Sequence, residues 1–128
     1  MEIFHSAVLT NSFSPYAKAT ILGNAVFFSG QVAIADDGSL IAGGIAKEAE
    51  KLFENIDIIL DELNIPKTNV VKMNIYIAKM DPDIFDEFNQ VYRSWIGDHR
   101  PARTAVGVYS LPKEANVEIE LIAENGGV

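Results

Sequence analysis

The stretch IAKEAEKLFENIDIILDELNIPKTNVVKMNIYIA, residues 45–78, contains two different apolar periodicities and decides the fold class. In residues 45–63 the apolar side chains recur every three or four positions, which predicts an amphipathic helix with one buried face. The Asn64-Ile65-Pro66 segment ends it, because a helix rarely continues into the residue before a proline. Residues 70–78 then alternate with a period of two, which predicts a strand. On one face of this strand we expect Val71, Met73, Ile75 and Ile77.

The segment before the helix reads as a β-hairpin. Residues 19–22 and 25–29 are rich in β-branched and aromatic side chains and flank Gly23-Asn24. Glycine at the first of two turn positions suits a type II′ turn, because it adopts a positive φ without a Cβ clash. Gly30 marks an expected bulge, beyond which residues 31–34 could extend the second strand.

The segment after residue 78 adds a helix and two strands. Asp81-Pro82 predicts a helix start, with an N-cap followed by proline at the first helical position, and Gly97 predicts its end. Residues 103–109 and 116–124 read as the last strands. The complete order predicts an α+β domain, a two-layer sandwich of two helices on one face of a mixed β-sheet. Apolar strand residues such as Ile122 cannot all face the helices, so we expect the other sheet face to be covered in an oligomer.

Length and composition restrict the function. The 128 residues make one domain, 1–128, and the absence of cysteine excludes thiolate nucleophiles, disulfides and cysteine-ligated metals. A net charge of −8 disfavours nucleic acid and anionic membrane surfaces as partners. No apolar run is long enough to span a bilayer, and residues 1–5 lack the pattern of a signal peptide. We therefore expect a cytoplasmic protein.

Two local patterns carry candidate chemistry. In the last strand, alternation puts Glu118 and Glu120 on one face, where they either form a solvated strand face or supply a carboxyl group whose pKa burial raises toward neutrality. The segment His99–Arg103 is a cationic spot in an acidic chain, either an ordinary arginine pair at the surface or an anion site. His5 and His99 are expected to be structural or surface residues, and residues 36–38 a turn.

Several segments together resemble the RidA (YjgF) family. The C-terminal part of the resemblance consists of Pro101–Val106, Leu111-Pro112 and Val117–Ala123. Earlier parts of the chain are also similar to the family pattern: Ser14-Pro15-Tyr16, Phe28-Ser29-Gly30-Gln31, Asn55, and Asn89 with Tyr92. The resemblance extends over nearly the whole chain, in order.

The resemblance implies a chorismate-mutase-like α+β fold and a homotrimer with ligand clefts between subunits. It also implies hydrolysis of reactive enamines and imines, such as 2-aminoacrylate, 2-iminopropanoate and 2-iminobutanoate, to 2-keto acids and ammonia, without a cofactor or a metal. Arg103 would hold the substrate carboxylate, and Glu118 would orient or activate the attacking water. The remaining substrate-binding positions would be Tyr16, Ser29, Gly30, Asn89 and Ala105.

The chain departs from the family pattern at three positions. Thr104 replaces the usual serine or smaller residue after the arginine. Ala105 stands where many members have cysteine, so a thiol mechanism is excluded and only the main chain there could contribute. Glu48 stands where glutamine is common. Two other functions stay open: a non-catalytic module that binds small carboxylates in the same cleft, and the ribonuclease or translation-inhibitor activity with which some members are labelled. The acidic charge disfavours the latter.

Overall fold

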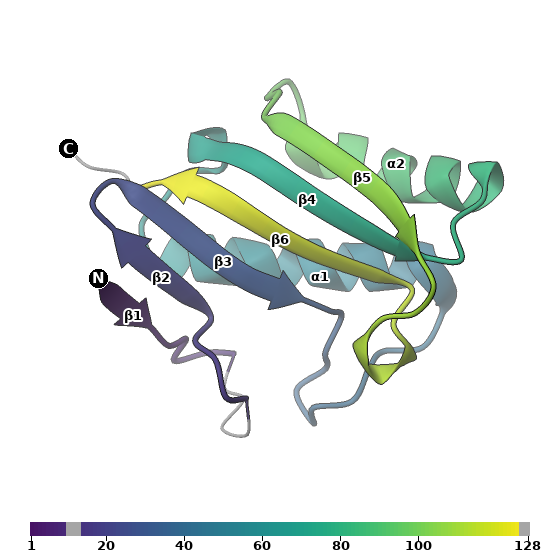
Figure 1. Ribbon diagram of the computed structural model, residues 1–128, viewed down its shortest axis with the longest axis horizontal. Helices are drawn as coiled ribbons and strands as arrows, with labels where there is room; N and C mark the ends of the chain where they lie inside the picture. The colour runs from purple at the N-terminus through teal and green to yellow at the C-terminus, as the bar shows by residue number, and fades with distance from the viewer. Residues whose placement is uncertain (10–13, 126–128) are drawn as a thin grey trace.

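The computed structural model describes residues 1–9 and 14–125 as a six-stranded sheet with two helices on one face (Figure 1). The strand order is β1-β2-β3-β6-β4-β5, and all neighbours are antiparallel except β4 and β5. The strands are β1 Glu2–Phe4, β2 Ala19–Leu22, β3 Ala25–Gln31, β4 Val70–Ala78, β5 Ala102–Val108 and β6 Val117–Glu124. The helices are α1 Gly44–Glu62 and α2 Pro82–Ile96, with 3₁₀ turns at Lys67–Asn69 and Pro112–Glu114. The predicted two-layer α+β sandwich is confirmed.

The hairpin of β2 and β3 forms as predicted. Gly23 has a φ of +59°, which the turn requires, and Leu22 pairs with Ala25 on its two sides. β3 ends at Gln31, and Ile34 instead forms an isolated bridge with Leu40. The sequence did not predict β1, whose three residues are too few for a periodicity and which is defined by its pairing with β2.

The predicted alternation of β4 is wrong at one residue, Val71. Val70 is buried and Val71 is 48% exposed, whereas Met73, Ile75 and Ile77 face the helices as predicted. The pairing of β4 with β6 shifts register between Val70 and Lys72, so Val71 is the extra residue of a bulge. A bulge adds one residue to the alternation, and this reverses the face that a simple count assigns.

The two helices pack through an aromatic cluster. Asp81 caps α2 by accepting a hydrogen bond from the Ile84 backbone N–H. Trp95 of α2 stacks on Phe53 of α1 with ring centroids 4.5 Å apart, and its indole Nε1–H donates to Asp57 at 2.9 Å. Neither helix of the described residues has the length and apolarity that a transmembrane span requires.

The central strand β6 separates the two sheet faces. Its odd-numbered residues from Val117 to Ala123 are buried against the helices, and its even-numbered residues, with Glu118 and Glu120, lie on the other, open face. Phe27 and Val106 are about two-fifths exposed. The prediction that apolar strand residues cannot all face the helices is therefore confirmed, and their covering by other copies stays a prediction.

Candidate functional site

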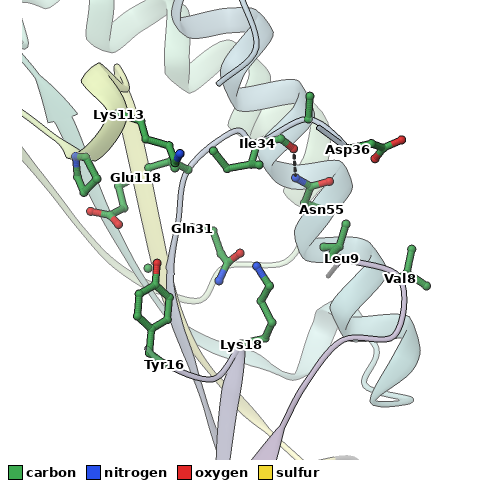
Figure 2. A pocket seen from close by; sticks show the side chains of 14 residues that line it. Val8, Leu9, Tyr16, Lys18, Gln31, Ile34, Asp36, Asn55, Lys113 and Glu118 are labelled. Atoms are coloured by element: carbon green, nitrogen blue, oxygen red, sulfur yellow. Dashed lines mark hydrogen bonds between the residues drawn. The ribbon is translucent and has the colours of Figure 1, made fainter. Parts of the chain in front are cut away.

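A cavity of about 230 Å³ lies beside Glu118, between the end of β3, the loop after it and the turn before β6. Of the predicted site residues, Tyr16, Gly30 and Glu118 line it. Figure 2 shows Tyr16 and Glu118 on one side of this cavity and Lys18 near its middle. Lys18 also lines it, and it was not among the residues predicted from the sequence.

Glu118 has the electrostatic environment of a proton-transfer group. Burial raises the pKa of its half-buried carboxyl group, and the charge of Glu120 raises that pKa further. Glu120 is held on the same face of the sheet by Tyr76, whose hydroxyl donates to it at 2.6 Å, and by the Asn74 amide at 3.2 Å. A carboxyl group with a raised pKa is a stronger base than an ordinary glutamate and exchanges its proton at a higher pH, which suits an acid–base group.

The backbone of β3 approaches Glu118 closely at Gly30. A Cβ added to Gly30 would lie 2.6 Å from Glu118 Oε2, well inside contact distance. The pairing of β3 with β6 shifts register between Phe28 and Gln31, which confirms the irregularity expected at this glycine. Glycine therefore allows the main chain of β3 to form one wall of the carboxylate site.

Ser29 makes contacts within its own chain. Its hydroxyl donates to the Ala17 carbonyl at 2.6 Å, and its backbone N–H donates to the Lys18 carbonyl at 3.0 Å. These two bonds fix the segment that carries Tyr16 against β3. Ser29 does not line the cavity beside Glu118.

Arg103 lies in a second cavity, between α2 and β5, that Asn89 also lines. The guanidinium carbon of Arg103 is 4.7 Å from the ring centroid of Tyr92 and 5.7 Å from that of Phe85. Stacking on two rings holds the planar guanidinium in place while its N–H edge can bind an anion. Burial raises the pKa of Tyr92, although the positive charges of the two nearby arginines oppose this effect.

The other cationic residues of this segment have structural partners. Arg100 Nη1 donates to the carbonyl oxygens of Gly97 at 2.6 Å and His99 at 2.9 Å. His99 Nε2 lies 2.7 Å from the Val70 carbonyl oxygen, so its side chain joins the segment before β5 to the start of β4. The structural role expected of His99 is confirmed, and Arg103 is the arginine of this pair that can receive a ligand.

Arg103 and Glu118 lie on opposite faces of the sheet in one chain. Arg103 pairs with Met73, whose side chain is fully buried toward the helices, whereas Glu118 pairs with Tyr76 on the open face. Paired residues of neighbouring strands project to the same face. The predicted site residues therefore form two half-sites: Tyr16, Gly30 and Glu118 in one, and Asn89 and Arg103 in the other.

The last of the predicted site residues is Ala105. Ala105 pairs with Ile75 and packs against the core, so its side chain joins neither cavity. Within residues 1–9 and 14–125, no three His, Asp or Glu side chains gather closely enough to hold a metal ion.

Comparisons with known proteins agree with this architecture. Residues 7–125 match the family model described as Endoribonuclease L-PSP. The protein MMF1, mitochondrial, of Saccharomyces cerevisiae is 41% identical over 84% of this chain and 73% of its own. The human 2-iminobutanoate/2-iminopropanoate deaminase is 32% identical over 98% of this chain and 90% of its own.

A solved structure is similar over the whole fold. The crystal structure of Escherichia coli TdcF with bound serine has a TM-score of 0.85 and 29% sequence identity, and the match covers 97% of this chain and 98% of that one. The match to this structure and the match to the family model therefore both extend over nearly every helix and strand described above. The chain belongs to the Endoribonuclease L-PSP family, which is the RidA family that its sequence resembles.

Proposed function

We propose that this protein hydrolyses small reactive 2-imino carboxylates, and the enamines that tautomerise to them, to 2-keto acids and ammonia. The observation that carries the proposal is Glu118, a partly buried carboxyl group with a raised pKa in a cavity. The human relative that bears a deaminase name aligns with nearly the whole chain, which supports the same chemistry here.

In the proposed reaction Arg103 binds the substrate carboxylate through two parallel hydrogen bonds. The substrate reacts as the protonated imine: Glu118 accepts a proton from water as the water oxygen bonds to the imine carbon and the C=N π electrons pass to nitrogen, which gives a neutral tetrahedral carbinolamine. Glu118 then returns this proton to the nitrogen, the C–N bond breaks with its electron pair leaving on ammonia, and the remaining hydroxyl loses its proton as the carbonyl forms. The products are a 2-keto acid and ammonia. The imine carbon is already electrophilic, so positioning supplies much of the acceleration and no cofactor is needed.

We propose that the two half-sites meet between copies of the chain, in a homotrimer with ligand clefts between subunits. The separation of Arg103 and Glu118 on opposite sheet faces supports this arrangement, since one chain does not present both to one small ligand. β5, which carries Arg103, is an edge strand, and the open sheet face carries partly exposed Phe27 and Val106. Both features favour association through the sheet.

Mixed assemblies test this proposal. Arg103→Ala and Glu118→Gln should each retain only a small fraction of the activity alone, whereas a coexpressed mixture should regain activity well above either variant. In a trimer whose sites each take one residue from either neighbour, random mixing restores about a quarter of the sites. The measurement is keto-acid and ammonia release from 2-iminopropanoate that an amino-acid oxidase generates in place.

The control is the doubly substituted chain coexpressed with wild type, which should only dilute the intact sites. Absence of any recovery, in mixed assemblies verified by native mass spectrometry, would show that Arg103 and Glu118 do not act together across an interface. Activity of Glu118→Gln alone at the wild-type rate would remove the proposed role of that carboxyl group.

Gly30→Ala should lower kcat by about 10- to 100-fold, because the new methyl group displaces the Glu118 carboxyl from its place against β3. The displaced atoms form the end of a flexible side chain, so the fold should persist. Gly107→Ala is the matched control, since its Cβ would meet Met80 rather than a site residue. Equal losses in the two variants would contradict the specific role of Gly30.

A second candidate function is a non-catalytic module that binds small carboxylates in the same place. The structure of TdcF with bound serine supports it, since serine carries a carboxylate and is not an imine. This function needs Arg103 but not the acid–base chemistry of Glu118. Carboxylate binding without any acceleration over the spontaneous hydrolysis of several imines would favour it.

Endoribonuclease activity is a third candidate because the family model is so described. The net charge of −8 opposes it, and we propose that neither nucleic acid nor a membrane is a partner. RNA cleavage that persists through purification and is lost in Glu118→Gln would support a nuclease. The cytoplasmic location stays a prediction, and the name of the yeast relative MMF1 assigns that protein to mitochondria.

A further inference from the structure

Lys18 places an amine inside the cavity of Glu118. It immediately precedes β2 and is half-buried, and Figure 2 shows its side chain directed into the space between Gln31 and Asn55. Within residues 1–9 and 14–125, the ion pairs join Lys47 to Glu50 and Lys51 to Glu54, and none involves Lys18. The fold therefore holds this amine in a cavity without an anionic partner from the described part of the chain.

Burial of this amine has a cost that a ligand could offset. Loss of solvation lowers the pKa of Lys18, and no carboxylate compensates for it. Asp36 lines the far end of the same cavity, but its carboxylate points away from Lys18 in Figure 2. An ammonium group in this environment gains more from a bound anion than a fully solvated lysine does.

Lys113 adds a second cation to the same cavity. It lies in the 3₁₀ turn directly before β6, and both Lys113 and Glu114 have a φ of +58°, in the left-handed region. Non-glycine residues in that region carry backbone strain, which is common where a side chain must be held at a site. The strained turn thus brings a lysine to the cavity five residues before Glu118 in the chain.

Apolar side chains form part of the remaining wall of the cavity. Leu9, Val32 and Ile34 are among the residues that line it. Methylene groups suit such walls, and an ammonium group suits an anionic end. The cavity therefore offers complementary surfaces to a short aliphatic chain that ends in a carboxylate.

We propose that the Lys18 cavity binds the side-chain carboxylate of the substrate, so that the favoured substrates are imines of acidic amino acids and the favoured products are dicarboxylic 2-keto acids. This inference rests on the proposed function, in which Arg103 of a neighbouring copy holds the other carboxylate. Lys18 is the main anchor because it is the more buried of the two lysines, and Lys113 adds to the positive potential.

The test compares two imines generated in place by amino-acid oxidases, one from glutamate and one from alanine. We expect wild type to show a higher kcat/KM for the glutamate-derived imine. Lys18→Met, which keeps the length of the side chain and removes its charge, should lower the ratio of the two kcat/KM values by about 10- to 100-fold. Lys18→Gln serves as a second, polar variant. Lys47→Met is the matched control, because Lys47 is an exposed lysine of α1 outside the cavity.

Binding provides a readout that does not depend on turnover. Calorimetry with 2-oxoglutarate and pyruvate should show tighter binding of 2-oxoglutarate to wild type, and Lys18→Met should abolish that difference. If both imines are hydrolysed but neither measurement depends on Lys18, this inference is overturned and the proposed function stands. If neither imine is hydrolysed, the proposed function fails, and a 2-oxoglutarate preference that requires Lys18 would still establish the dicarboxylate site. Equal binding of the two keto acids would overturn it.

Discussion

Replacing Glu118 by glutamine is expected to lower kcat for imine hydrolysis by about 10²- to 10⁴-fold, the usual contribution of a positioned acid–base group. Glutamine has nearly the same shape, so it should keep the wall of the cavity next to Gly30 while losing the ability to accept a proton from water. The dissociation constant of a 2-keto acid should change much less than kcat. The measurement pairs initial rates, corrected for the spontaneous reaction, with calorimetric binding of the product.

The pH dependence of the wild-type rate provides a further check. An unperturbed glutamate carboxyl group has a pKa of 4.5, and burial and the charge of Glu120 raise the pKa of Glu118 above this value. Because the ionised form accepts the proton from water, kcat should rise with pH through this raised pKa and then level off. This rise of kcat with pH should disappear in Glu118→Gln. If the rise persists unchanged in this variant, the titrating group is not Glu118.

Stability separates this effect from unfolding. A carboxyl group whose pKa is raised by folding contributes stability that is fully present below its unfolded pKa and is lost as pH rises through its folded pKa. Wild type should therefore lose this contribution as pH rises through the raised pKa of Glu118, and Glu118→Gln should not. At pH values above that pKa the variant should be at least as stable as wild type, as measured by thermal unfolding. A marked loss of stability would mean that inactivity does not report on catalysis.

Substitution of Arg103 by alanine should reduce kcat/KM by about 10- to 100-fold, because a charged hydrogen-bond pair with a carboxylate contributes about 1.5–3 kcal/mol. The stacking of its guanidinium on Tyr92 and Phe85 holds the group in place before a ligand arrives, which limits the entropy lost on binding. Arg103→Lys should recover only part of the loss, since an ammonium group lacks the planar fork. Steady-state kinetics with 2-iminopropanoate give both values.

Arg100→Ala is the control for Arg103→Ala. It removes an equal charge close to the same cavity, but Arg100 already donates to two backbone carbonyl groups. We expect a much smaller change in kcat/KM. A loss as large as that of Arg103→Ala would indicate that the general positive potential, and not one bidentate contact, attracts the substrate.

Periodicity was sufficient to predict most of the fold. The change from a helical to an alternating pattern between residues 45 and 78 correctly predicted α1 and β4, and the Asp81-Pro82 pair marked the start of α2. The alternating pattern assigned Val71 to the wrong face, because the bulge adds a residue there and the sequence of the strand does not show which residue is the added one. The short strand β1 depends on its partner and has no local pattern of its own.

The candidate site was less accessible from the sequence. Alternation within β6 correctly grouped Glu118 with Glu120, but it could not relate them to Arg103 on a different strand. Only the register through β4 shows that Arg103 and Glu118 lie on opposite faces. Lys18 precedes its strand and belongs to no motif, so its entry into the cavity follows only from the packing of the loops around it.

The position of Trp95 in the helix layer has a practical consequence for experiments in solution. Trp95 is the only tryptophan of the chain, and it lies on α2, on the side of the sheet opposite the open face. Its ring stacks on Phe53, and Lys67 Nζ lies 4.7 Å from its ring centroid. Its fluorescence should therefore follow the separation of the two helices from each other and respond little to contacts made by the open face. Emission spectra recorded during dilution would then distinguish the unfolding of a single copy from the dissociation of an assembly.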